Sequence, residues 1–251
     1  MSQLFCKSDI LQNPLSVTDW QLDAFKKFSA KMEDSSHKFP CIPAVLAYRL
    51  NHLRYEFAED PGTEEAAEQA AGAIQDFGPR SKEFGSYASL VIFFRTPDEA
   101  DVTVQGYRDV FWSLLERIST YDEKHWPDEI PADPHESAWE FCFHGERYFV
   151  YCGTPAHQNR NSRSFPYFML ALTPRWVLQE FMENGEKAAK VKRSIRKRLE
   201  AYDHVPAHPD LKFYGSDENF EWKQYFLSDD EAAPSRCPFS AVRKKLRKLM
   251  E

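Results

Sequence analysis

The chain has 251 residues, a net charge of −7 at pH 7, 42% hydrophobic residues and 28% charged residues. Such a chain buries a sizeable core, and its negative charge disfavours a general nucleic-acid binder. No apolar run approaches the roughly 18 residues that a membrane span needs, and the N-terminal residues lack the pattern of a signal peptide. The five cysteines, at irregular spacing, indicate neither a disulfide framework nor a structural zinc site. We therefore expect a cytoplasmic protein without a membrane segment.

Apolar residues at helical spacing predict three helices in the first third of the chain, over about 17–33, 43–60 and 63–78. The second helix begins at a favourable proline and carries its apolar stripe through Leu53 and Phe57. Thr63 is a good N-cap for the third helix, and two glutamates follow it in the first turn. The first third of the chain is thus expected to be helical.

Four strands are predicted after these helices. The run SLVIFFR at 89–95 is short, apolar and β-favouring, which indicates a buried strand. Aromatic residues alternate along the chain on both sides of His144-Gly145, and this pattern predicts an antiparallel hairpin over about 138–152. A further apolar run predicts a strand at 165–172.

Segments with helical spacing also lie between and after these strands, at 104–121, 175–184, 187–202 and 241–250. Helices around a few hairpin-connected strands predict an α+β fold, in which a small, mainly antiparallel sheet packs with several α-helices. We expect one domain over residues 1–251, with the 17–33 helix and the basic 241–250 helix at its periphery. A parallel crossover between the 89–95 strand and the hairpin is the alternative, because a helix lies between them.

The loop between the hairpin and the 165–172 strand holds His157, Arg160 and Arg163 within seven positions. Loops on a rigid scaffold often carry binding residues. A histidine there is a candidate metal ligand or general base, and two arginines with planar guanidinium groups suit a carboxylate or phosphate. Each residue also has an ordinary interpretation, which is local hydrogen bonding for the histidine and surface ion pairing for the arginines.

Cys41 and His144 are further candidates. Cys41 lies where a helix is predicted to begin, and a helix N-terminus lowers a thiol pKa, so it is either a thiolate ligand or nucleophile or a small buried hydrophobe. His144 at the hairpin turn is either a ligand or a solvated turn residue. The basic faces at 187–198 and 243–248 could contact nucleic acid, but on amphipathic helices of an acidic protein a solvated face is the more usual interpretation.

Several short motifs occur in the same order as in a known family. They are Phe39-Pro40-Cys41, Leu53-Arg54-Tyr55-Glu56-Phe57, a Phe-x-Phe-x-Gly-x-x-x-Phe-Val hairpin at 141–150, the Arg160 and Arg163 loop, and Cys237-Pro238-Phe239. Roughly residues 39 to 240, as a single domain, resemble the YqcI/YcgG family. Ile42-Pro43-Ala44 replaces the family's commoner Pro-Phe-Gly, and the loop around His157 also departs from the commoner pattern. The chain is therefore similar to a divergent subgroup.

Some members of this family are haem-dependent N-oxygenases. The resemblance therefore implies a monooxygenase that uses haem b, an iron cofactor, together with O2 and an external reductant. Its partners would be an electron donor and a small amine or guanidine whose nitrogen is hydroxylated. A haem needs an apolar slot, one axial ligand and cations for its two propionates, and the aromatic residues of this chain suit the slot.

The resemblance also gives the candidate residues their roles. His157 is the first choice as axial ligand, because it shares a short loop with Arg160 and Arg163, which would meet the propionates. Cys41, whose thiolate would favour O–O cleavage, and His144 are the alternatives. An acidic residue would hold a cationic substrate, and three candidates stand equal: Glu140, Glu146 and Asp217.

Two other functions stay open at this point. One is a haem carrier or sensor without oxygenase turnover. The other is a cofactor-free protein whose basic helices bind a partner or nucleic acid. The sequence does not identify the substrate, the reductant or the oligomeric state, and a homodimer is one possibility.

Overall fold

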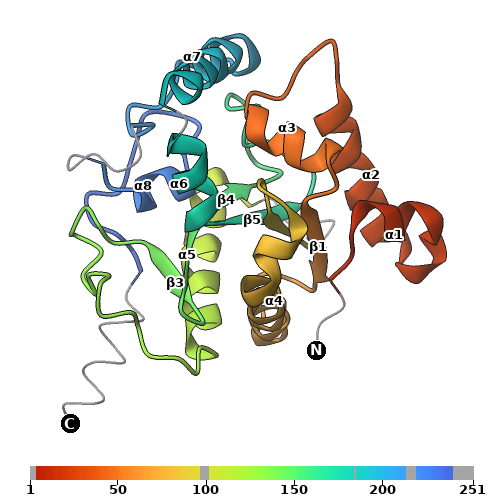
Figure 1. Cartoon of the computed structure of the whole chain (residues 1–251), viewed down its shortest axis with the longest axis horizontal. Helices are drawn as coiled ribbons and strands as arrows, with labels where there is room; N and C mark the ends of the chain where they lie inside the picture. Colours follow the sequence, from red (N-terminus) through yellow and green to blue (C-terminus); the bar gives the residue numbers. More distant parts are fainter. Residues whose placement is uncertain (1–3, 97–101, 184, 213–218, 240–251) are drawn as a thin grey trace.

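The computed structural model of the protein describes residues 4–96, 102–183, 185–212 and 219–239. Within these residues the chain forms a five-stranded sheet in the order β1-β2-β5-β4-β3 (Figure 1). The strands are β1 (Leu53–Ala58), β2 (Ser89–Phe94), β3 (Phe141–Phe143), β4 (Glu146–Gly153) and β5 (Phe168–Pro174). Only β1 and β2 pair in parallel, and the other neighbours pair antiparallel. The predicted α+β class with a mainly antiparallel sheet is confirmed.

The helices lie on both faces of the sheet. They are α1 (Lys7–Gln12), α2 (Asp19–Glu33), α3 (Ile42–Arg49), α4 (Glu64–Phe77), α5 (Val104–Thr120), α6 (Arg175–Glu183), α7 (Gly185–Tyr202) and α8 (Trp222–Tyr225), with 3-10 turns at Pro14–Ser16 and Gly78–Phe84. Figure 1 shows α4 and α5 on one side of the sheet and α2, α3, α6 and α7 on the other. In the described part of the chain, no helix combines the length and the apolar character that crossing a bilayer would require.

Alternation along the strands divides the core into two parts, because successive side chains point to opposite faces. On β2, Leu90 and Ile92 join the core beneath α4 and α5, whereas Val91 and Phe93 join the core beneath α2 and α3. The helix expected at the periphery, α2, buries four side chains here, and the ring of its Phe28 lies 5.6 Å from that of Phe93. A cavity remains between this second core, which reaches Tyr202 at the end of α7, and the helices α6 and α7.

The prediction of one helix over 43–60 is wrong. The helix α3 ends at Arg49, the chain turns at Asn51 with φ of 60°, and β1 follows at Leu53–Ala58. Leu53 and Phe57 are four apart, so they satisfy helical spacing, but they also occupy alternate positions of a strand and pack against β2. Pairing with a buried neighbour strand outweighed the local helical pattern.

The alternative of a parallel crossover from the 89–95 strand to the hairpin is also wrong. The neighbours of β2 are β1 and β5, and the parallel crossover runs from β1 through α4 to β2. The other predicted helices and strands up to residue 202 are confirmed within a few residues of their expected bounds. The basic helix predicted at 241–250 lies outside the described residues.

We expect Gly85→Ala to destabilise the protein by about 1–3 kcal/mol. Gly85 has φ of 111°, and an added Cβ would lie 2.4 Å from Nε2 of His52. The matched control is Gly72→Ala in α4, where the added Cβ has nothing within 4 Å. The control should gain up to about 1 kcal/mol from the better helix propensity of alanine. Urea denaturation compares the two variants, and equal stabilities would contradict the strain assigned to Gly85.

Candidate functional site

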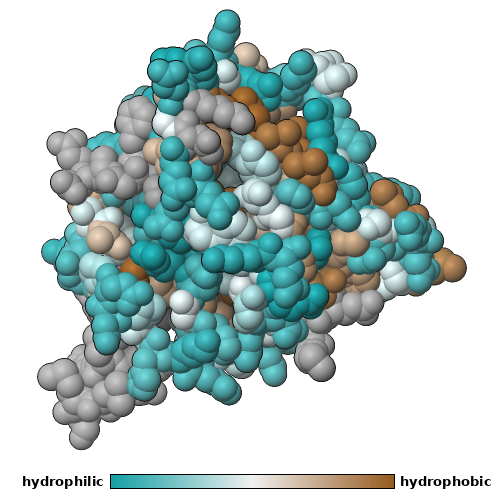
Figure 2. Space-filling view, in the orientation of Figure 1, coloured by the Kyte–Doolittle hydropathy of each residue, from teal (hydrophilic) through white to brown (hydrophobic). Residues whose placement is uncertain are grey.

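A cavity of about 380 Å³ lies between the sheet and the helices α2, α3, α6 and α7. Its floor is formed by cavity-facing residues of β2, β5 and β4, among them Val91, Met169, Ala171 and Phe149. Figure 2 shows hydrophobic residues gathered at the surface between α7 and α3, the helices that carry two of the walls. The size and the apolar, aromatic lining are typical of small-molecule sites, which span roughly 300–1,000 Å³.

Cys41 places a free thiol in the wall of this cavity. It is the N-cap residue of α3, which begins here because Pro43 suits the first turn of a helix. Burial raises the pKa of the Cys41 thiol, and this effect outweighs the hydrogen bond from the Ala44 amide and the nearby charge of Arg163, which both lower it. The thiol is therefore neutral, whereas the helix N-terminus alone had suggested a lowered pKa.

Three lysines also line the cavity: Lys31 from α2, Lys192 from α7, and Lys212. The Nζ of Lys31 donates to the carbonyl oxygens of Asn161 and Ser164, at 2.9 and 2.6 Å. Burial lowers the pKa of Lys31 to about 8. The cavity thus combines an apolar interior with cationic groups in parts of its wall.

An acidic residue, Glu221, lines another part of the cavity wall, at the start of α8. Its Oε1 lies 3.1 Å from a guanidinium nitrogen of Arg175, and the same nitrogen lies 2.6 Å from Oε1 of Glu140. Both carboxyl groups are buried. Burial, reinforced by the charge of Glu140, raises the pKa of Glu221 to about 8, and burial also raises the pKa of Glu140.

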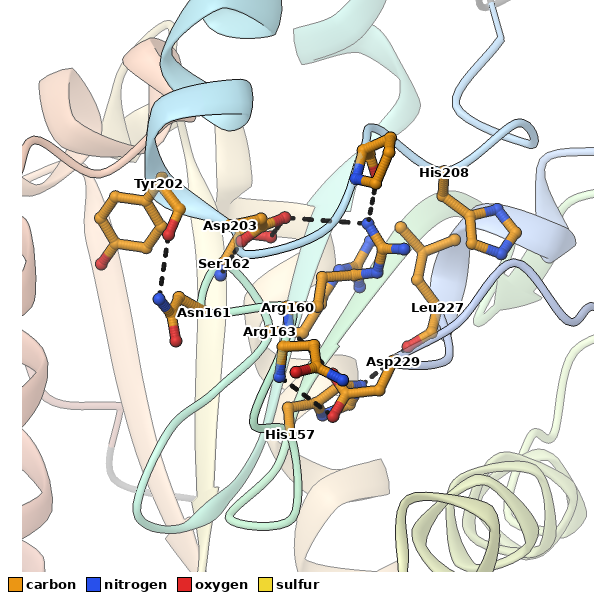
Figure 3. A network of polar contacts seen from close by, with 12 residues as sticks. His157, Arg160, Asn161, Ser162, Arg163, Tyr202, Asp203, His208, Leu227 and Asp229 are labelled. Atoms are coloured by element: carbon orange, nitrogen blue, oxygen red, sulfur yellow. Dashed lines mark hydrogen bonds and ion pairs between the residues drawn. The ribbon is translucent and has the colours of Figure 1, made fainter.

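His157 lies in the loop after β4, and both of its ring nitrogens are engaged (Figure 3). Nε2 is 2.8 Å from the carbonyl oxygen of Leu227, and Nδ1 is 2.8 Å from the hydroxyl of Thr154. A carbonyl oxygen only accepts, so Nε2 carries the proton and Nδ1 accepts from Thr154. Burial lowers the pKa of His157 to about 4, which keeps the ring neutral.

Arg160 is buried and joins the loop to two later segments of the chain. Its guanidinium donates to three carbonyl oxygens and lies 3.7 Å from a carboxylate oxygen. The carbonyls belong to Ser228, Pro206 and Asp230, and the carboxylate to Asp203. Each of the three guanidinium nitrogens is therefore bonded to one of the protein's own oxygens.

Arg163 has the same kind of role at the end of α8. It donates to the carbonyl oxygens of Tyr225 and Gln224 at 2.8 Å and to that of Cys152 at 3.3 Å. Its guanidinium carbon also lies 4.3 Å from the ring centre of Tyr151. A cation at the C-terminal carbonyls of a helix is favourable, so Arg163 fixes α8 against β4.

Of the candidate ligands and anion partners predicted from the sequence, Cys41 is the one that the structure brings to the cavity. His157, Arg160 and Arg163 form a buried network with α8 and the segment after it (Figure 3), outside the described lining of the cavity. His144 lies at the β3–β4 turn with φ of 53°, where its backbone amide donates to Asp122 at 2.9 Å.

Of the three acidic candidates, Glu140 reaches the cluster around Arg175, Glu146 begins β4 away from the described lining, and Asp217 lies outside the described residues. Glu221 and the three lysines were not predicted from the sequence to line a site. Glu221 lies in an irregular aromatic segment without periodicity, so no local signal distinguished it.

The comparisons with known proteins agree on one family. The model of the YqcI/YcgG family matches residues 28–240. The chain is 45% identical to protein YqcI of Bacillus subtilis (strain 168) over 250 residues, which cover 99% of this chain and 98% of the relative. It is 43% identical to YcgG of the same organism over 248 residues, 98% of each chain.

A third relative has a name that states an activity. The chain is 30% identical over 231 residues to the Streptomyces lavendulae protein named "Putative N(omega)-hydroxy-L-arginine synthase DcsA". The match covers 89% of this chain and 85% of that relative. No solved structure matches the chain.

Proposed function

Because the chain belongs to the YqcI/YcgG family, we propose that it is a haem-dependent N-oxygenase that hydroxylates a nitrogen of a small amine or guanidine. The name of the Streptomyces lavendulae relative, which describes the N-hydroxylation of a guanidine, supports the reaction class. The observation that carries the proposal is the apolar cavity with a free thiol in its wall. An apolar, aromatic lining of this kind suits a flat apolar cofactor.

The residues around the cavity fit a haem. A haem needs an apolar slot, one thiolate or imidazole ligand and cations near its propionates. The aromatic floor provides the apolar slot, and Cys41 provides a thiolate ligand. The cations near the propionates would be Lys31, Lys192 and Lys212. When bound, the haem would supply O2 activation, which a thiolate ligand favours, with electrons from an external donor.

The structure favours Cys41 over His157 as the ligand. The Cys41 thiol faces the cavity and has a protein environment that keeps it neutral until a metal lowers its pKa. His157 would have to break both of its buried hydrogen bonds to reach a metal. Arg160 and Arg163 lie outside the described lining with their guanidinium groups bonded to carbonyl oxygens, whereas the three lysines line the cavity, so the lysines are the better partners for propionates.

The chain's own residues contribute binding and the exclusion of water. The aliphatic and aromatic lining keeps bulk water from the reacting nitrogen, which protects an oxidising site from unproductive side reactions. The floor strands and the α2, α3, α6 and α7 walls are packed on a common sheet, so they hold substrate and cofactor in a fixed relation.

The absorption spectrum of protein from cells supplied with a haem precursor tests the cofactor. We expect a Soret band in the wild type that is lost or strongly shifted in Cys41→Ala. The matched control is Cys6→Ala, because Cys6 is also a half-buried free thiol at a helix N-cap but lies outside the described lining of the cavity. His157→Gln and His144→Ala should keep the wild-type band.

Product analysis by mass spectrometry, with reductant, O2 and a panel of amines and guanidines, tests the reaction. We expect the addition of one oxygen atom to a nitrogen of at least one panel member. A colourless protein that also fails to take up added hemin would contradict the proposal. A stable haem spectrum without any substrate-dependent O2 consumption would instead favour a carrier or sensor.

A further inference from the structure

Glu221 is the most unusual residue in the cavity wall. The residue is 4% exposed, and its Oε1 meets Arg175, whereas its Oε2 is buried without a hydrogen-bond partner among the described residues. Buried carboxylate oxygens in proteins are almost always satisfied, because an unpaired buried charge is costly. A buried carboxyl oxygen without a partner in the wall of an apolar cavity therefore points to a polar group that arrives with a ligand.

The charges around Glu221 come from several packed elements. Arg175 of α6 is shared with Glu140, which precedes β3 and also keeps an oxygen without a partner among the described residues. The charges of Arg175 and of Arg147 on β4 both lower the pKa values of the two carboxyl groups. The charge of Glu146 instead raises the pKa of Glu140. Two carboxyl groups contact the single guanidinium of Arg175. When both carboxyl groups are ionised, one negative charge is left for a further cation.

We propose that Glu221, held by Arg175 and assisted by Glu140, binds the ammonium or guanidinium group of the substrate in the cavity. This inference rests on the proposed function, because that function makes the cavity the place of reaction. A carboxylate only accepts hydrogen bonds, and a guanidinium offers donors in a planar fork that matches it. A carboxylate would repel a haem propionate. Glu221 is therefore matched to the cationic group of the substrate, and the three lysines are matched to anionic groups.

Cation binding at Glu221 should be linked to proton release. With a pKa raised to about 8, Glu221 holds its proton at neutral pH when no cation is present. Binding of R–NH3+ then converts Glu221–COOH to Glu221–COO− and releases one H+ to solvent, so charge and protons balance. The apparent affinity for a cation should therefore rise with pH up to about 8 and level off above it.

Isothermal titration calorimetry on the full-length protein tests the inference independently of turnover. The probes are the monocations butylguanidinium and butylammonium, with butylurea and 1-butanol as their neutral isosteres. We expect at least one cation to bind about tenfold or more tighter than its isostere. Titration at pH 7 in buffers of different ionisation enthalpy should show proton release, which disappears well above pH 8.

Glu221→Gln keeps the size of the side chain and removes its charge. We expect this variant to lose the preference for the cation by about tenfold or more and to lose the proton release. Glu146→Gln is the matched control, because burial also raises the pKa of Glu146 although it lies outside the described cavity lining. Circular dichroism checks that both variants fold, and Glu221→Asp, which retains the charge, should keep part of the preference.

Three outcomes would overturn the inference. They are equal affinities of the wild type for cations and isosteres, wild-type cation binding without proton release at pH 7, and an unchanged cation preference in Glu221→Gln. A cationic substrate that is oxygenated with the same KM by wild type and Glu221→Gln would overturn the inference while supporting the proposed function. Glu221-dependent cation binding in a protein that neither binds haem nor oxygenates any panel member would support the inference and contradict the proposed function.

Discussion

Arg163→Met is expected to lower the free energy of unfolding by about 3 kcal/mol or more. The guanidinium of Arg163 satisfies three buried carbonyl oxygens, two of them at the C-terminal end of α8. Methionine fills a similar space but offers no donor, so these acceptors would stay buried without partners. Each such acceptor costs roughly 1–3 kcal/mol, partly relieved if water enters or α8 shifts.

Urea denaturation of Arg163→Met beside Arg95→Met measures this effect. Arg95 is 63% exposed in its side chain and lies 3.7 Å from Glu59, so its replacement should change stability by less than about 0.5 kcal/mol. Arg163→Lys should fall between the wild type and Arg163→Met, since an ammonium keeps the charge but not the planar fork. Equal stabilities of the Arg163→Met and Arg95→Met variants would show that α8 does not depend on these bonds.

The contribution of His157 to stability is expected to be complete above pH 6.5 and to disappear as the pH falls to about 4. Its pKa drops from 6.5 to about 4 on folding, so in this window the unfolded chain binds a proton that the folded protein excludes. Stability therefore falls as the pH is lowered, by on the order of 3 kcal/mol in total. The physical reason is burial, which penalises the charged imidazolium, and the nearby charges of Arg163 and Arg160 lower the pKa of His157 further.

The difference between wild type and His157→Gln isolates this contribution. The effect of Glu221 on stability has the opposite pH dependence, because its raised pKa removes stability as the pH rises from 4.5 to about 8. This effect is the same in wild type and His157→Gln, so it cancels in their difference. We expect the free energy of unfolding of the wild type to exceed that of His157→Gln at pH 7.5, and this difference to be smaller at pH 4. His125→Gln, a change at an exposed side chain, should leave the profile unchanged. A difference that is constant between pH 7.5 and 4 would refute the neutral, buried state of His157.

Local patterns were enough to predict most helices and strands, because each element carries its own signal. Thr63 caps α4 by accepting from a backbone amide, and His144-Gly145, both at positive φ, closes the hairpin. The error at 43–60 arose where two periodicities coincide, since Leu53 and Phe57 fit both a helix and a strand. Only the long-range pairing of β1 with β2 separates these alternatives.

The site was harder to predict, because a side chain's type does not identify its partner. Arg160 and Arg163 are the kind of residues that bind anions, yet the oxygens they meet are backbone carbonyls far along the chain. Cys41 could be named from its position at a helix start. Glu221 could not, because its place in the cavity depends on where α8 packs against β4.

The walls of the cavity have a consequence for the order of events during synthesis. They are contributed by α2 and α3 near the start of the chain and by α6, α7 and α8 near its end. Chains emerge from the ribosome N-terminus first, so the early walls and the floor exist before the late walls do. An occupant is therefore captured only by the nearly finished protein. N-terminal fragments that end before α6 would display an open apolar surface in place of a binding site, which exposes a truncated chain to aggregation.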